Sequence, residues 1–251
     1  MIVDVRYDGH AGWYDTTFHA YGDAQGSAGL LARLLGPADP ADSTYADIGC
    51  GTGLHFGAVA EKGYRAIGVD VSADQLRIAA SRNPRLIRAD ARRLPIATAS
   101  ITTAVMTFVH TDVDDFPAAV AEAARVLRPG GRLIYLGVHP AYVGAFCDRR
   151  AETADREACL RAGYGDERIH RDPTGTYPMR SRVGVRYLTL ATFLGAFLAQ
   201  PGLRLTAVHE LDTNMRPWQP EPSDGRVVPW NIAITAHAVA PAHSPRQALS
   251  S

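Results

Sequence analysis

The order of apolar and polar positions predicts alternating strands and helices through the first 140 residues. Four leucines between residues 30 and 35 recur on one face of a helix, and the pattern stops at Gly36-Pro37. We expect strands at 43–48, 64–71, 85–90, 100–110 and 132–139, and helices at 25–35, 54–63, 72–83 (capped by Ser72) and 114–127. This alternation predicts an α/β fold built on a parallel sheet.

The pattern changes after residue 139. Residues 140–184 are polar, rich in charge and interrupted by Gly and Pro, which predicts an insertion and not a second core. Strands are expected again at 203–211 and 230–239, and because a loop joins them without a helix they should be antiparallel neighbours. We therefore expect one domain over residues 1–240, with a doubly wound seven-stranded sheet that is mostly parallel and has an antiparallel last strand, followed by a disordered tail at 241–251.

Composition and charge narrow the class of protein. Apolar residues make up 46% and charged residues 21% of the chain, which is enough for a packed core. Lys plus Arg and Asp plus Glu both number 26, and the formal net charge of +0 argues against a nucleic-acid partner. The three cysteines form no CxxC pair, so neither a zinc site nor a disulfide framework is expected. No basic-then-apolar leader and no bilayer-spanning run are present, which predicts a soluble cytoplasmic protein without membrane contact.

The stretch YADIGCGTGLHFG at residues 45–57 places a glycine-rich turn between a predicted strand and a predicted helix. Such a turn lets backbone N–H groups approach a ligand at a helix end that favours negative charge. A dinucleotide-binding turn reads G-x-G-x-x-G, whereas Gly49, Gly51 and Gly53 spell G-x-G-x-G. A nicotinamide dinucleotide is one candidate ligand, and Leu54 at the place of the third dinucleotide glycine argues against it.

The sequence DIGCGTG at 47–53 resembles the first motif of the class I S-adenosylmethionine-dependent methyltransferases, of the small-molecule, type 11-like kind. The resemblance continues through GVDVS at 68–72, RADARRLP at 88–95 and LRPGG at 127–131, and covers residues 45–138 motif by motif. It implies a Rossmann-like fold and S-adenosyl-L-methionine as the cofactor. It also implies that residues 1–40 contain an N-terminal lid and that the insertion, residues 140–185, lies over the acceptor pocket.

The same resemblance assigns contacts to the cofactor. Asp47 is expected to hold the amino end of the methionine moiety, Asp70 to bind the ribose hydroxyls and Asp90 to accept a hydrogen bond from the adenine amino group. The glycines let the cofactor lie against the turn, and the residues after the fourth strand line the methyl-donor sulfur. The expected cofactor-binding set is Asp47, Gly49, Cys50, Gly51, Gly53, Asp70, Val71, Asp90, Ala91, Phe108, Val109 and Tyr14.

Methyl transfer from a sulfonium is an in-line displacement, so the protein mainly supplies alignment and excludes water, and only some acceptors need a base. His110 and His139 follow the fourth and fifth strands at the edge where ligands bind, and they are the candidate bases. The alternative for each is a hydrogen-bonded histidine that shapes the pocket. Tyr14 of the lid is the third candidate catalytic residue, whereas Trp13 and Phe18 could equally pack as one side of an amphipathic helix.

Acidic and basic clusters elsewhere in the chain have simple explanations. Asp112, Asp114 and Asp115 could suggest a metal site, but a solvated helix N-terminus explains them better, and no metal is expected. The arginines of the insertion could pair with an anionic acceptor or only cover a solvated face.

These observations predict a methyltransferase that acts on a small-molecule acceptor, at oxygen or nitrogen, and that is a monomer or a homodimer. High Ala, Arg and Gly usage is typical of GC-rich bacteria, in which such enzymes often serve secondary metabolism. Two alternatives stay open. One is a protein that uses the same cofactor and fold for cyclisation or epimerisation, and the other is a nicotinamide oxidoreductase.

Overall fold

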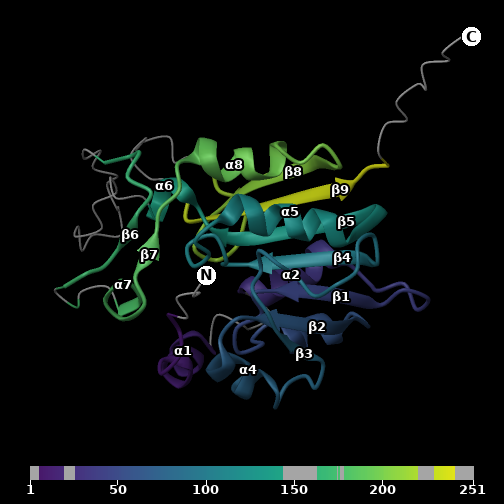
Figure 1. The fold of residues 1–251 in the computed structure, drawn as a ribbon, viewed down its shortest axis with the longest axis horizontal. Helices are drawn as coiled ribbons and strands as arrows, with labels where there is room; N and C mark the ends of the chain where they lie inside the picture. Colours follow the sequence, from purple (N-terminus) through teal and green to yellow (C-terminus); the bar gives the residue numbers. More distant parts are fainter. Residues whose placement is uncertain are drawn as a thin grey trace, which may run out of the picture.

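A seven-stranded sheet forms the centre of the computed structural model, which describes residues 6–19, 26–143, 163–173, 175, 178–219 and 229–240 (Figure 1). Its strands are β1 (Thr44–Ile48), β2 (Arg65–Asp70), β3 (Leu86–Arg88), β4 (Ile101–Thr107), β5 (Leu127–Val138), β8 (Leu203–Leu211) and β9 (Asn231–Ala238). They lie in the order β3-β2-β1-β4-β5-β9-β8. The first five pair in parallel, and β9 runs antiparallel to β5 and β8. The predicted fold class is confirmed.

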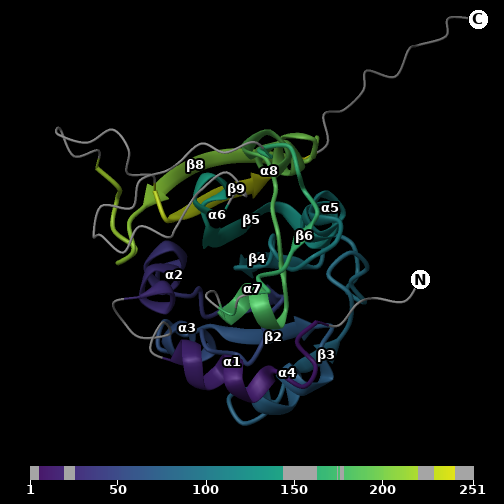
Figure 2. The same cartoon turned by 90° about the vertical axis from the view of Figure 1, so that its left-hand side faces the viewer.

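Helices cover both faces of this sheet. One face carries α2 (Ser27–Leu35), α3 (Phe56–Ala60) and α4 (Ala73–Ala79), and the other carries α5 (Phe116–Val126) and α8 (Leu190–Leu198). Successive side chains of a strand point to opposite faces, so on β5 Ile134 contacts the α2 face while Leu133 and Tyr135 contact the α5 face. Helix α1 (Ala11–Phe18) lies beside α4 in both views (Figures 1 and 2).

The described parts of the insertion lie at the edge of the sheet where the parallel strands end. They comprise α6 (Pro140–Val143), β6 (Ile169–His170), α7 (Pro178–Arg182) and β7 (Val185–Arg186), next to the N-terminal segment (Figure 1). Tyr187 and its neighbours pack against Val138 at the end of β5 and Trp230 before β9. The insertion is thereby seated over the carboxyl ends of the strands.

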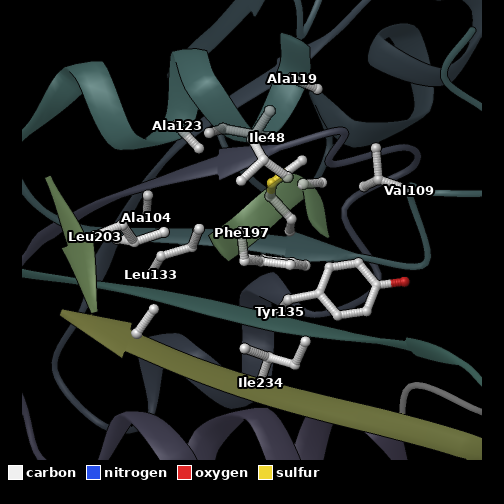
Figure 3. Close-up of a cluster of buried hydrophobic side chains, with 14 of the residues drawn as sticks. Ile48, Ala104, Val109, Ala119, Ala123, Leu133, Tyr135, Phe197, Leu203 and Ile234 are labelled. Atoms are coloured by element: carbon white, nitrogen blue, oxygen red, sulfur yellow. The ribbon is translucent and has the colours of Figure 1, made fainter. Parts of the chain in front are cut away.

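The main core lies between the sheet and the helices α5 and α8 (Figure 3). The rings of Phe116, Tyr135, Phe193 and Phe197 meet there, and Phe116 and Phe193 stack with centroids 5.5 Å apart and planes 4° apart. Asp115 caps α5 by accepting a backbone N–H of its first turn, which sets the start of the helix beside Phe116. Burial of each large ring contributes about 2–3 kcal/mol, so this cluster fixes α5 and α8 to the sheet.

Most predicted elements are present, and several end earlier than expected. Ser72 caps α4 as predicted by accepting a backbone N–H, but the helix ends at Ala79. The helix expected over 54–63 is reduced to Phe56–Ala60, because Leu54 and His55 still belong to the glycine turn. Strand β5 starts earlier than predicted, and the apolar segment after residue 186 forms α8.

Some sequence predictions fall outside the described residues. They concern the disordered tail at 241–251 and the middle of the insertion at 144–162, with Arg149, Arg150, Arg156 and Arg161. Within the described ranges, no helix has the length and apolar character needed to cross a bilayer.

Truncation of the stacked ring pair tests this account of the core. Phe193→Ala should lower the free energy of unfolding by about 3–4 kcal/mol in urea titrations, because it leaves a cavity among packed rings. The matched control is Leu198→Ala on the same helix, where the side chain is 69% exposed. It should change stability by less than about 0.5 kcal/mol. Equal effects of the two substitutions would contradict the assigned core.

Candidate active site

Three glycines with left-handed backbone form the turn between β1 and α3. Gly49, Gly51 and Gly53 have φ values of 78°, 56° and 76°, which other residues rarely adopt. A Cβ atom on Gly49 would come within 2.8 Å of Val109 Cγ2, and one on Gly53 within 2.5 Å of the Phe56 ring. The predicted turn is therefore confirmed, and two of its glycines are required by space as well as by conformation.

Asp47 of β1 is almost completely buried just before this turn. Its Oδ1 atom has no hydrogen-bond partner among the described residues. Burial, and to a lesser degree the charge of Asp70, raises the pKa of the Asp47 carboxyl to about 7. An ionised carboxylate in this position is costly unless a donor or a cation reaches it, and the structure thus offers a site for a positively charged group.

Asp70 at the end of β2 joins two parts of the site. Its Oδ2 accepts the Gly51 N–H at 2.8 Å and its Oδ1 accepts the Ser72 N–H at 2.9 Å. Burial raises the pKa of Asp70, and these backbone hydrogen bonds oppose that effect. Each oxygen keeps a lone pair for a ligand hydroxyl. Val71, the expected adenine wall, follows directly and is half-buried.

Asp90 follows β3 and already has a strong partner. Arg92 Nε donates to both of its oxygens at 3.0 Å, and Arg92 Nη2 donates to Oδ2 at 2.7 Å. The hydrogen bonds from Arg92 lower the pKa of Asp90. Ala91 lies half-buried between the two. The sequence analysis did not foresee this ion pair. It keeps Asp90 ionised, and Arg92 already occupies part of the acceptor capacity of both carboxylate oxygens.

The turn after β4 brings a strained aromatic residue to the glycine turn. Phe108 has a φ of 56°, which is unfavourable for a bulky side chain, and its N–H donates to Leu136 O at 2.7 Å. Val109 packs on Gly49. Both residues thus lie close to the glycine turn.

His55 is a functional candidate that the sequence analysis missed. Its Nε2 lies 2.9 Å from Ser27 Oγ and its Nδ1 3.4 Å from Thr107 Oγ1, while its ring stacks with Phe108 at a centroid distance of 6.4 Å. Burial lowers the pKa of His55 to about 4, so the imidazole is neutral at neutral pH. Its only signal in the sequence was its position two residues after the last glycine of the motif.

A narrow cavity lies at the centre of these elements. It is lined by the turn from Gly49 to Thr52 and by Leu54, His55, Thr107, Phe108 and Tyr14. Helix α1 therefore brings Tyr14 to the glycine turn, as expected for a lid. The ring of Tyr7 meets Tyr14 edge-on at 5.4 Å, and burial raises the pKa of Tyr14 far above its usual value.

Ion pairs hold α1 in this position. Arg82 of the segment after α4 donates to both oxygens of Asp15, at 2.6 and 2.9 Å, and to Thr52 O at 2.6 Å. On the other side of α1, the guanidinium of Arg182 lies 4.6 Å from the centre of the Trp13 ring. Helix α1 is thus fastened to the glycine turn and to the insertion.

His110 lies in the aromatic core instead of at the cavity. It is fully buried, its Nδ1 lies 2.5 Å from the Tyr135 hydroxyl, and the rings of Phe116 and Phe193 surround it. Burial lowers its pKa to about 3. This placement favours the alternative in which His110 is a hydrogen-bonded residue that shapes the pocket from the core.

His139 has partners for both ring nitrogens, whereas His110 Nε2 has none among the described residues. Its Nδ1 accepts the Ala141 N–H at 3.0 Å, and its Nε2 lies 3.2 Å from Glu210 Oε1. Burial lowers the pKa of His139, and Glu210 opposes that shift. A proton on Nε2 completes both hydrogen bonds, so neither nitrogen is free to act as a base.

The interpretation of Asp112 as a solvated residue is wrong. Asp115 caps α5 and is exposed as expected, but Asp112 turns inward, where Thr111 Oγ1 donates to its Oδ2 at 3.1 Å. Arg6 Nη2 lies 3.5 Å from its Oδ1, and burial raises its pKa to about 6. The sequence analysis misplaced Asp112 because its partner Arg6 comes from the far end of the chain.

Arg6 connects three segments at this point. Its guanidinium donates to the carbonyl oxygens of Val183 and Gly184 in the insertion and of Thr111 after β4. In the ranges that the structure describes, no three His, Cys, Asp or Glu side chains are grouped so that they could hold a metal ion.

Comparison with known proteins identifies the domain that carries this site. Residues 46–135 match a family model described as a methyltransferase domain. The chain carries a methyltransferase domain. A demethylmenaquinone methyltransferase from Mycolicibacterium gilvum (strain PYR-GCK) is 33% identical over 136 residues, which are 53% of this chain and 58% of the relative. The chain thus spans somewhat more than half the length of this curated relative.

Two solved structures share the fold of the methyltransferase domain. One is an S-adenosylmethionine-dependent methyltransferase from Mesorhizobium loti, with a TM-score of 0.64, 21% identity, and coverage of 86% of this chain and 100% of the other. The second is the geranyl diphosphate C-methyltransferase from Streptomyces coelicolor A3(2), in complex with Mg2+, geranyl-S-thiolodiphosphate and S-adenosyl-L-homocysteine. It has a TM-score of 0.56 and 18% identity, and covers 84% of this chain and 75% of that one. The likeness confirms the predicted resemblance at the level of the fold, and the descriptions of both neighbours name S-adenosylmethionine or its demethylated product.

Replacement of Asp47 by Asn should change the stability of the folded chain and its affinity for the cofactor in opposite directions. The pKa of Asp47 is raised on folding, so the ionised carboxylate destabilises the folded chain as pH rises from about 4 through about 7. At about pH 8, Asp47→Asn should therefore raise the free energy of unfolding by about 1–3 kcal/mol, and at about pH 4 this gain should vanish.

The same variant should bind S-adenosylhomocysteine at least about tenfold more weakly in calorimetry, because the amino group loses its counter-charge. Asp39→Asn, at an exposed position, is the control and should change neither quantity. A destabilised Asp47→Asn variant with wild-type affinity would contradict the assigned role of the carboxylate.

Proposed function

We propose that the whole chain is an S-adenosylmethionine-dependent methyltransferase that methylates oxygen or nitrogen of a small molecule in bacterial secondary metabolism. The observation that carries the proposal is the buried Oδ1 atom of Asp47, which has no partner among the described residues and lies next to a turn of three left-handed glycines. A ligand that bears an ammonium and a sulfonium satisfies that carboxylate. Relatives named for demethylmenaquinone and for geranyl diphosphate support a small organic acceptor.

The described residues fit this cofactor along its length. When bound, it supplies a methyl group on an activated sulfonium. Asp47 is proposed to bind the amino end and Asp70 the ribose, while Asp90 keeps acceptor capacity for an adenine amino group beside Arg92. Cys50 and Tyr14 line the cavity, and the Tyr14 ring favours a nearby cation. Val71, Ala91 and Val109 are proposed to complete the binding set as apolar neighbours of the cofactor.

The chemistry of the histidines favours an acceptor that needs no strong base. Burial lowers the pKa of His55, His110 and His139 alike, so each is a weak base at neutral pH. A phenolate, a carboxylate or an amine can attack the methyl group without one. Among the predicted catalytic residues, His110 and His139 are therefore proposed to shape the pocket. Tyr14, at the cavity, is proposed to align the acceptor, with His55 as a hydrogen-bond acceptor.

The lid and the insertion are proposed to exclude water from the acceptor. Arg6 ties the N-terminal segment to the insertion, and Arg82 ties α1 to the glycine turn. Residues 140–185 are proposed to cover the acceptor pocket, supported by their contacts with the ends of β5 and β9. A cytoplasmic location and a monomeric or homodimeric state belong to the same proposal.

Mass spectrometry tests the reaction directly. The chain, incubated with S-adenosylmethionine and a panel of phenols, carboxylic acids and amines, should yield products heavier by one methylene together with S-adenosylhomocysteine. An isomerised or cyclised product of unchanged mass would support the alternative chemistry instead. Binding of a nicotinamide dinucleotide without binding of S-adenosylhomocysteine would overturn the proposal.

Substitution of Tyr14 tests the lid. Tyr14→Leu should weaken binding of S-adenosylmethionine by about tenfold, because the ring no longer faces the sulfonium, whereas Tyr14→Phe should bind within about twofold of wild type. The neutral thioether S-adenosylhomocysteine should be much less sensitive to the same change. Equal losses for both nucleosides would show that the ring only fills space.

A further inference from the structure

A second, larger cavity of about 290 Å³ lies away from the glycine turn, between α2 and the strands β8 and β9. Figure 2 shows α2 and the ends of β8 and β9 on the same side of the molecule. Its apolar walls are Leu30, Leu34, Leu211, Met215, Pro217 and Ala233. The volume is close to the lower end of the range for small-molecule sites, so we call this cavity the α2 groove.

One wall of the α2 groove is a tightly built loop. Asp212 Oδ1 accepts the N–H groups of Asn214 and Arg216 at 2.8 and 2.9 Å, and Leu211 forms a backbone bridge with Pro217. Met215 within this loop has a φ of 58°, a costly conformation for a residue other than glycine. The loop thus holds the Met215 side chain against the groove despite local strain.

The inner end of the α2 groove adjoins the candidate active site. Leu30, Leu136, Leu211, Met215 and Ala233 form one cluster, and Phe108 packs against it while also lining the cavity at the glycine turn. Helix α2 contributes to both spaces, because Ser27 at its start contacts His55 and Leu30 one turn later lines the groove. A molecule at the active site could therefore extend past Phe108 into the groove.

The outer end of the groove carries the positive charge of Arg33. Arg33 and His209 stand there, and both side chains are exposed. Within the ranges described, Arg33 forms no ion pair, whereas most of the arginines around the glycine turn are paired. Because apolar walls favour an aliphatic chain and a free guanidinium favours an anion, the α2 groove suits a molecule with both.

We propose that the α2 groove binds the aliphatic chain of an amphipathic anion, with the chain along Leu30 and Leu34 and the anionic group at Arg33. This ligand is the acceptor itself, so the inference rests on the proposed function and adds to it a substrate class: acceptors with an apolar chain that ends in a negative charge.

Calorimetry with decanoate as the probe tests the groove without knowledge of the acceptor. Decanoate should bind the full chain with a dissociation constant of tens to hundreds of micromolar, and hexanoate at least about tenfold more weakly because less apolar surface is buried. Arg33→Gln should lower the affinity for decanoate about threefold to tenfold but leave the affinity for the neutral analogue decanol unchanged. Leu34→Gln should lower the affinity for both decanoate and decanol.

A matched variant and a second ligand complete the experiment. Arg204→Gln, an exposed arginine on β8 outside the groove, should bind decanoate as the wild type does. S-adenosylhomocysteine, titrated into each variant, reports correct folding, and decanoate should not displace it because the groove and the cavity at the glycine turn share no lining residue.

The possible results are distinguishable. Binding of decanoate that Arg33→Gln and Leu34→Gln do not weaken, displacement of S-adenosylhomocysteine by decanoate, or absence of decanoate binding would each overturn the inference. A chain that dimerises through the groove and does not bind decanoate would overturn it as well. Failure of the wild type to bind S-adenosylhomocysteine would instead contradict the proposed function, whatever decanoate does.

Discussion

A buried carboxylate oxygen without a partner is costly when it is ionised, and the fold holds Asp47 Oδ1 in that state near the end of β1, as far as the described residues go. Parallel strands bring Asp70 to the same edge of the sheet, and its charge raises the pKa of Asp47 further. The left-handed glycines that follow Asp47 form a tight turn in which a Cβ on Gly49 or Gly53 would collide with Val109 or Phe56. A cationic ligand can offset the desolvation free energy of this carboxylate by pairing with it. The other residues of the site are arranged around that interaction.

Hydrogen bonds and ion pairs join the surrounding segments to this edge of the sheet, from which they are proposed to exclude water. Arg6 reaches the insertion and the turn after β4, and Arg82 joins α1 to the glycine turn. Interactions between charges strengthen as water leaves. Closure of these segments over a bound cation therefore strengthens their ion pairs and the attraction between the cation and Asp47. The core behind them, with its stacked Phe116 and Phe193, is rigid by comparison and provides the fixed side of the site.

Sequence reasoning recovered what local backbone chemistry decides. The glycine turn, the Ser72 cap and the strand ends at Asp47 and Asp70 depend on residues close together in the chain, and the structure has them as predicted. It missed Arg6 and misplaced Asp112, because they meet over a long separation in sequence. His110 stands at the expected strand end, but rings from three distant elements draw its side chain into the core. Position along a strand predicts which edge a residue reaches, and only packing decides where its side chain points.

Proton release on cofactor binding tests the central claim most directly. Calorimetric titrations of S-adenosylhomocysteine in buffers of different ionisation enthalpy, at about pH 6.5, give the number of protons exchanged. If the ligand's ammonium satisfies the Asp47 carboxylate, whose pKa is about 7 in the free chain, binding lowers that pKa and releases roughly half to three-quarters of a proton. The release should disappear at about pH 8.5, where the carboxylate is already ionised. Binding without proton release at the lower pH, or with proton uptake, would contradict the account.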